Sequence, residues 1–255
     1  MQETVTIERL WRYPVKGLSP ERMSAAMLSP GDPIPGDRRY AIENGPSGFD
    51  PAAPRHLAKM HFLMLMRNER LATLRTRFDD ATTTLEIGTG RETIRGDLST
   101  AEGRARIEAF FGSFIPAELR GAPKVLEAPG FSFSDVARRV VSIINASSVT
   151  ALEQRIGLPV DPLRFRGNLH VSGLPPWGEF DLVGKHLAAE GGPRLRVVKR
   201  IVRCAATDVD PVTGFRDMRI PRVLDEAYGH SDFGVYAEVM EGGELREGST
   251  LRVVA

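Results

Sequence analysis

The chain contains a single cysteine, and its surroundings are the strongest indication of chemistry in the sequence. Cys204 is the only thiol among 255 residues and ends the basic segment KRIVRC, residues 199–204. A lone thiol cannot form an intramolecular disulfide or a CxxC redox pair. The cations Lys199, Arg200 and Arg203 favour the thiolate form, which is a nucleophile and a soft metal ligand. Cys204 is therefore a small core residue, a nucleophile, a persulfide carrier or a single ligand to a thiophilic metal.

Two short segments in the first half could supply cations to an anionic ligand. In YPVKG, Lys16 leaves a strand end into a turn that Gly17 permits; the alternative is a solvated turn lysine. In GDRRY, strand alternation sends Arg38 and Arg39 to opposite faces, so at most one of them points into a shared site. A guanidinium suits phosphate oxygens, although a surface ion pair with Asp37 explains the segment equally well.

The segment RFRGN, residues 164–168, is a third candidate. On a strand, Arg164 and Arg166 share one face, where two cations beside a buried strand require an anionic or carboxylate partner. Gly167 allows close approach of another backbone. Asn168 offers both a donor and an acceptor, as recognition of a heterocycle edge requires. We expect this segment to bind a ligand.

The segment NASS, residues 145–148, marks the change from a buried strand to a helix. The free N–H groups of a helix start suit a phosphate or another polar ligand. Capping of the helix by Asn145, Ser147 or Ser148 is the alternative.

These segments must be positioned by a fold that the sequence predicts to be mainly β. Most periodic stretches are short, rich in Val, Ile, Thr and Leu, and bounded by Gly, Pro or Asp. The expected strands are 5–11, 23–28, 39–43, 72–78, 83–87, 92–95, 124–127, 140–144, 168–171, 186–189, 195–202, 235–239 and 251–254. The expected helices are 100–111, 147–156 and 221–228. A Gly- and Pro-rich stretch at 118–135 predicts two domains, residues 1–125 and 126–255.

The composition narrows the class of protein. With 42% hydrophobic and 26% charged residues and a net charge of +1, nothing in bulk draws the chain to nucleic acid or to a membrane surface. The longest apolar run, 62–66, is far shorter than the ~20 residues of a spanning helix. One cysteine and no visible export signal favour the cytoplasm. We therefore expect a cytoplasmic protein with no nucleic-acid or membrane partner.

The motifs YPVKG, GDRRY, NASS, RFRGN and RCAATDVDPVTG occur in this order along the chain. That order resembles the MOSC family, a domain named after the C-terminal part of molybdenum cofactor sulfurases. The N-terminal half is similar to the β-barrel domain that precedes it in the mitochondrial amidoxime-reducing component and its bacterial relatives. The resemblance implies a mainly β (α+β) fold with few short helices, in which a MOSC β-barrel packs against an N-terminal β-barrel-like domain.

The resemblance also implies a pterin-based molybdenum cofactor (molybdenum–molybdopterin) between the two domains. By position, Lys16 and Arg38 would hold its phosphate and Asn145 and Ala146 its pterin. Arg166 would face the cofactor. Asn168 is expected to bind the cofactor as well, because its amide offers both a donor and an acceptor. Cys204 would be the molybdenum ligand, with Val202 and Arg203 lining the metal site.

The chain departs from the family pattern at three positions. Gly17 stands where many relatives have serine, Val202 stands where some relatives have serine, and Gly167 replaces the proline of the FRPN pattern. Some bacterial relatives carry a C-terminal [2Fe–2S] domain, whereas no further cysteine follows Cys204 here. Electrons are therefore expected from a separate protein.

Three functions fit these residues. The first is a molybdenum oxidoreductase that reduces small N-hydroxylated compounds, with Cys204 as metal ligand and catalytic residue. The second is a sulfur carrier that holds a Cys204 persulfide, supplied by a donor such as a cysteine desulfurase. The third is a non-catalytic cofactor-binding module in which Cys204 is a core residue.

Overall fold

A computed structural model describes residues 4–254. Its strands are β1 (Thr4–Arg12), β2 (Glu21–Met23), β3 (Ala25–Leu28), β4 (Ala41–Asn44), β5 (Arg75–Asp79), β6 (Thr84–Gly88), β7 (Thr93–Asp97), β8 (Pro123–Leu126), β9 (Val141–Asn145), β10 (Leu169–Ser172), β11 (His186–Ala189), β12 (Arg194–Val202), β13 (Asp232–Glu241), β14 (Gly243–Arg246) and β15 (Thr250–Val254). The α-helices are α1 (Ala101–Phe114), α2 (Ala146–Ile156) and α3 (Ile220–Tyr228). Short 3-10 helices are η1 (Lys59–His61), η2 (Glu69–Thr73), η3 (Pro116–Glu118), η4 (Pro162–Phe165), η5 (Gly178–Leu182) and η6 (Ala205–Asp208).

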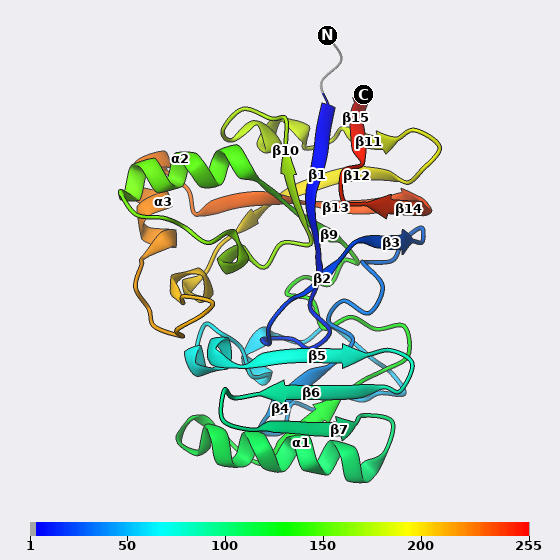
Figure 1. The fold of residues 1–255 in the computed structure, drawn as a ribbon, viewed down its shortest axis with the longest axis vertical. Coiled ribbons are helices and arrows are strands. Elements are labelled where there is room, and N and C mark those ends of the chain that lie inside the picture. The colour runs from blue at the N-terminus through cyan, green and yellow to red at the C-terminus, as the bar shows by residue number, and fades with distance from the viewer. Residues whose placement is uncertain (1–3, 255) are drawn as a thin grey trace.

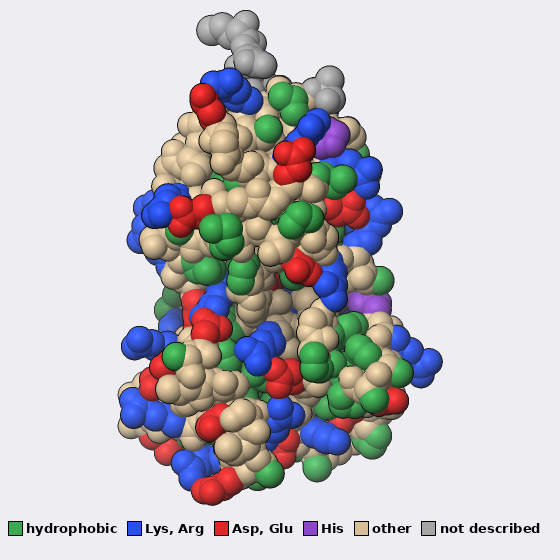
Figure 2. Space-filling view, turned by 90° about the vertical axis from the view of Figure 1, so that its right-hand side faces the viewer, with side chains coloured by type: hydrophobic (Ala, Val, Ile, Leu, Met, Phe, Trp, Pro, Cys, Tyr) green, Lys and Arg blue, Asp and Glu red, His purple; other side chains and the backbone are tan. Residues whose placement is uncertain are grey.

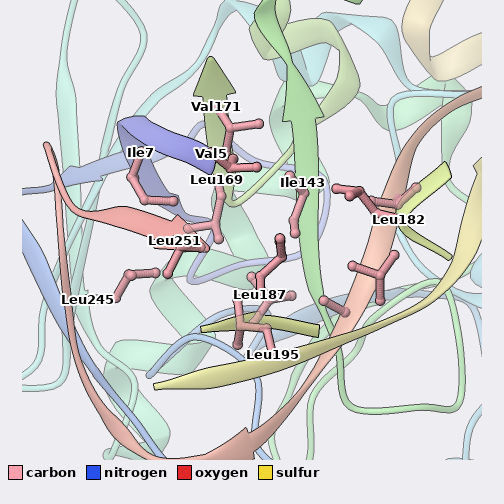
Figure 3. Packing of buried hydrophobic residues seen from close by; sticks show 14 of the residues in the cluster. Val5, Ile7, Ile143, Leu169, Val171, Leu182, Leu187, Leu195, Leu245 and Leu251 are labelled. Atoms are coloured by element: carbon pink, nitrogen blue, oxygen red, sulfur yellow. The ribbon is translucent and has the colours of Figure 1, made fainter. Parts of the chain in front are cut away.

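Seven strands close into a barrel in the order β1-β10-β9-β13-β12-β11-β15, with β15 returning to β1. The β9–β10 pair is parallel and the other pairs are antiparallel. Closure satisfies the hydrogen-bonding edges that an open sheet would expose. Alternate residues point inward from every strand, and Figure 3 shows Val5, Ile143, Leu187 and Leu251 meeting in the apolar interior.

The other part of the molecule is a small α+β layer. The antiparallel sheet β5-β6-β7 packs beside α1 and the β4–β8 ladder, below the barrel in Figure 1. Thr100 caps α1 by accepting a hydrogen bond from the Gly103 backbone N–H. A Cβ at Gly103 would lie 2.0 Å from the Asp97 carbonyl oxygen, so only glycine lets this helix approach its sheet so closely.

The mainly β fold with a barrel and few helices is confirmed. Strand β1 is part of the barrel wall, where it pairs with β10 and β15. The barrel therefore combines residues 4–12 with strands from the second half of the chain. The domain division at 125/126 stays a prediction. The expected strand at 23–28 is two strands, the start of 72–78 is 3-10 helix, and β14 was not predicted.

Positive and negative side chains are interspersed on the face shown in Figure 2, in keeping with a net charge of +1. Among residues 4–254, no helix is long and apolar enough to cross a membrane.

Candidate functional site

A pocket of about 310 Å³ opens beside the barrel, with walls from both the barrel and the smaller layer. Its volume lies within the range of small-molecule sites. The predicted site residues that line it are Lys16, Arg38, Arg166, Asn168, Val202, Arg203 and Cys204. Asn145 and Ala146 do not line it. The fold thus brings most of the dispersed motifs to one cavity.

Lys16 enters the pocket from a turn and is almost fully buried. Its backbone N–H donates to the Tyr40 carbonyl at 2.8 Å, and its Nζ donates to the Phe133 carbonyl at 2.9 Å. The ammonium also forms an ion pair with Asp135. Burial lowers the pKa of Lys16, and Asp135 opposes this effect. Lys16 is therefore a charge held inside the site and not a solvated turn lysine.

Gly17 is required by the path of this turn. Its φ of 83° is in the left-handed region, and a Cβ there would lie 2.8 Å from the Leu63 carbonyl oxygen. A serine at this position would be both strained and crowded, which accounts physically for the departure from the family pattern.

Arg38 points into the pocket, and Arg39 points away from it to an ion pair with Glu127. Arg38 pairs with the buried carboxylate of Asp37, which also accepts the Tyr13 backbone N–H at 2.8 Å. Burial opposes the charge of Arg38 most strongly, but Asp37, together with Tyr13, Asp135 and Tyr236, outweighs it and raises the pKa of the guanidinium. The φ of 53° at Arg38 is rare for a residue with a side chain and concentrates backbone strain at the site.

The expectation that Arg164 and Arg166 share a strand face is wrong, because residues 162–165 form the 3-10 helix η4. Asp161 starts this helix by accepting the Leu163 backbone N–H at 2.8 Å, and Pro162 suits its first turn. Arg164 is neutralised by Asp210 and Asp217, at 3.1 and 2.7 Å.

Arg166, just after η4, has no carboxylate partner. Its φ is 51°, its Nη1 donates to the Leu18 carbonyl at 2.8 Å, and its buried Nη2 has no partner within residues 4–254. Burial lowers the pKa of Arg166 to about 10, so it remains a cation at neutral pH. A buried guanidinium with an unused N–H is suited to receive an anion.

Tyr13 lies against two of the pocket arginines, Arg38 and Arg166. Its ring centroid lies 4.3 Å from Cζ of Arg166 and 4.9 Å from Cζ of Arg38. Burial raises the pKa of Tyr13 to about 12, so the phenol is neutral and its ring provides a cation–π surface.

Two polar side chains that were expected to bind the cofactor, Asn168 and Asn145, are hydrogen-bonded to other groups of the protein. Asn168 accepts from the Ser142 N–H and hydroxyl at 3.1 and 2.7 Å and donates to the Trp11 carbonyl at 3.2 Å. Asn145 caps α2 through the Ser147 N–H and donates to Glu179 Oε2 at 2.9 Å. Ala146 is exposed at the first position of α2. The structure therefore shows the capping alternative at 145–148.

Cys204 follows β12 and is half-buried in the pocket wall. Its carbonyl accepts the N–H and hydroxyl of Thr207, both at 3.0 Å, which fixes the turn into η6. Val202 is 72% exposed at the rim. Arg203 donates to the Phe165 and Phe233 carbonyls at 2.7 and 2.8 Å, and burial lowers its pKa to about 10.

Nothing in the sequence indicated that three titratable residues, Lys59, Asp135 and Tyr236, would line the pocket. Burial alone would lower the pKa of Lys59, but the neighbouring Cys204 sulfur and Asp135 outweigh it and raise the value. Asp135 sits in the segment between β8 and β9, where no motif marked it. Partial burial opposes its ionisation, but Lys16, Lys59 and Arg38 hold its pKa well below the usual range.

The pocket is strongly basic. Its charged lining residues are Lys16, Arg38, Lys59, Arg164, Arg166, Lys199, Arg200 and Arg203, against Asp135 alone. Such a cavity favours an anionic ligand, although the whole chain is almost neutral. Residues 4–254 contain no group of three or more His, Cys, Asp and Glu side chains that could hold a metal ion. A metal at Cys204 would therefore have to arrive with ligands of its own.

Comparison with known proteins identifies the family of this chain. The MOSC domain model matches residues 128–252, and the MOSC N-terminal beta barrel domain model matches residues 4–117. The chain belongs to the MOSC domain family. It is also 34% identical over 117 residues to a molybdenum cofactor sulfurase of Caenorhabditis briggsae, a match that covers 43% of this chain and 16% of that protein.

Two solved structures are also similar. The YUAD protein of Bacillus subtilis has a TM-score of 0.50 and 15% identity, over 99% of this chain and 97% of that one. YiiM of Geobacillus stearothermophilus has a TM-score of 0.36 and 18% identity, over 45% and 54%. The first supports the fold alone.

Proposed function

We propose that the pocket binds a pterin-based molybdenum cofactor with Cys204 as the thiolate ligand of the metal. The observation that carries this proposal is that one cavity contains both the only thiol of the chain and the cations Lys16, Arg38 and Arg166. A thiolate suits a thiophilic metal, and guanidinium groups suit a phosphate.

The residues fit such a group. The buried Nη2 of Arg166 lacks a partner, and a phosphate oxygen would provide one. A cofactor that brings its own sulfur ligands needs only one thiolate from the protein, and Cys204 is the one that is present. Arg38 and Arg166, linked through the Arg166 carbonyl, would bind the anionic end.

We infer that the activity is reduction of small N-hydroxylated compounds, with electrons from a separate protein. When bound, the cofactor supplies two-electron transfer at the metal. Cys204, just after β12, would hold the metal through its thiolate. Release of the N-hydroxyl oxygen as water takes two protons along with the two electrons, and Lys59 Nζ, in the same pocket as the Cys204 sulfur, would supply one of them, with the other taken from solvent. Val202 leaves the rim open to substrate.

A sulfur carrier is the second candidate, because the half-buried Cys204 faces a cation and the relative in C. briggsae is named a molybdenum cofactor sulfurase. The chain spans about a sixth of that relative's length, so a role in sulfur transfer is a proposal for this chain. Here Cys204 would hold a persulfide from a cysteine desulfurase. A cytoplasmic location stays a prediction for either function.

One pair of assays separates the two functions. Cofactor-replete protein with a chemical or protein reductant should convert benzamidoxime to benzamidine, and Cys204→Ser should not. Incubation of the cofactor-free protein with a cysteine desulfurase and cysteine should leave the intact mass unchanged. A stable gain of about 32 Da that dithiothreitol removes, together with no reduction of N-hydroxy compounds, would favour the sulfur carrier instead.

A further inference from the structure

The buried ammonium of Lys16 is already paired with a carboxylate from the chain itself. Asp135 contacts Lys16 Nζ, and the lysine side chain is 6% exposed whereas that of Asp135 is 52% exposed. The lysine is thus fixed in the wall, and the carboxylate reaches it from the solvent side. Both residues line the pocket, so an anion that binds Lys16 Nζ there must compete with the Asp135 carboxylate.

The segment that carries Asp135 is attached on both sides but not at its centre. Before it, the Phe133 N–H donates to the Arg38 carbonyl at 2.8 Å. After it, Arg139 pairs with Asp32 at 2.5 Å. Within the described part of the chain, residues 134–139 make no backbone–backbone hydrogen bond. Asp135 can therefore leave Lys16 without breaking secondary structure.

We propose that Asp135 is an internal competitor at the Lys16 subsite: an anion that binds Lys16 must displace this carboxylate, which weakens the binding of every anion. This inference rests on the proposed function for the natural ligand, but its chemistry concerns only the anion. The displacement of Asp135 is the same step for every anion, so it weakens the binding of singly and doubly charged ligands by a similar factor. A phosphate monoester carries close to two charges at neutral pH and so competes more strongly for Lys16, Arg38 and Arg166.

The test uses two probes of similar shape, phenyl phosphate and benzenesulfonate, titrated calorimetrically into the full-length, cofactor-free protein at low salt. The wild-type protein should prefer phenyl phosphate by about tenfold or more. Asp135→Asn should bind both probes about tenfold more tightly than the wild type, and should still prefer phenyl phosphate. No gain in affinity for either probe in Asp135→Asn would overturn the proposal.

Asp32→Asn is the matched control, because it releases Arg139 on the same segment and leaves the carboxylate at Lys16. It should bind both probes like the wild type; an equal gain would attribute the effect to segment mobility and overturn the proposal. Asp135→Ser provides a second route if the asparagine variant folds poorly. Lys16→Met in the Asp135→Asn background should remove the gain, and a retained gain also counts against the subsite.

Metal and pterin content are measured separately on the same preparations. A gain in affinity in Asp135→Asn without any molybdenum in the preparations would leave this inference standing and remove the proposed function. Bound molybdenum with no such gain would do the reverse.

Discussion

Arg38 Nη2 donates a hydrogen bond of 3.1 Å to the backbone carbonyl of Arg166, which is 128 positions away in the sequence. Both residues adopt positive φ values, 53° and 51°, and both guanidinium groups lie against the ring of Tyr13. Two strained backbones and one aromatic ring thus hold two cations side by side. Strain of this kind persists only where the surrounding structure enforces it, and here it shapes the anion-binding end of the pocket.

Removal of the charge at Arg166 and at Arg164 should have different effects on anion binding and on the free energy of unfolding. Arg166→Met should weaken phenyl phosphate binding about tenfold or more, because a charge-assisted hydrogen bond is lost. Its free energy of unfolding should stay the same or rise, because a buried N–H without a partner is removed.

Arg164→Met is the matched variant. Its loss leaves Asp210 and Asp217 without their buried cation, so the free energy of unfolding should fall by about 3 kcal/mol while anion binding persists. Urea unfolding and calorimetry test both variants. The same stability loss in both would contradict the assignment of separate roles.

Gly167 lets the loop approach strand β9. A Cβ at this position would lie 2.3 Å from Cγ1 of Ile144, so Gly167→Ala should destabilise the protein by about 1–3 kcal/mol. Ile144→Ala removes the clashing atom, so the double variant should be less destabilised than the sum of the two single variants. Additive changes in urea unfolding would show that the contact is not the cause.

Buried His170 should make stability depend on pH. Burial, aided by Arg9, lowers the pKa of His170 from 6.5 to about 4, so the folded protein keeps it neutral while the unfolded chain protonates. The contribution of neutral His170 to the free energy of unfolding is complete above pH 6.5. It is lost as the pH falls toward 4, which lowers the free energy of unfolding by about 3 kcal/mol in all.

His170→Phe keeps an aromatic partner for Trp11 and cannot titrate. Urea unfolding of both proteins between pH 7 and 4 should show a steeper loss for the wild type. Parallel pH profiles would rule out His170 as the source.

Much of the fold could be predicted from local pattern. Thr100 begins α1 and Gly157 ends α2 as their chemistry predicts, because capping depends on nearby residues only. The strand β14 could not be anticipated, because the four residues 243–246 pair with β3 more than 200 positions earlier. Closure of the barrel through β1 likewise depends on long-range pairing.

Part of the site could also be predicted from local sequence motifs. Lys16, Arg38 and Cys204 stood out by their motifs, and the fold places them in one pocket. The expected position of Arg164 on a strand face is wrong, because strand alternation does not apply where Asp161 and Pro162 start the 3-10 helix η4. Asp135 lies in an irregular segment and Lys59 begins the short 3-10 helix η1, and only the folded chain shows that they meet Lys16 and Cys204.

The most direct test of the account is elemental and pterin analysis of the wild type and Cys204→Ser, purified from cells that make the cofactor. We expect the wild type to contain molybdenum and pterin in near-equimolar amounts with protein, and Cys204→Ser to lose the metal. Wild-type protein without either component, or a Cys204→Ser variant that retains as much molybdenum as the wild type, would contradict the account.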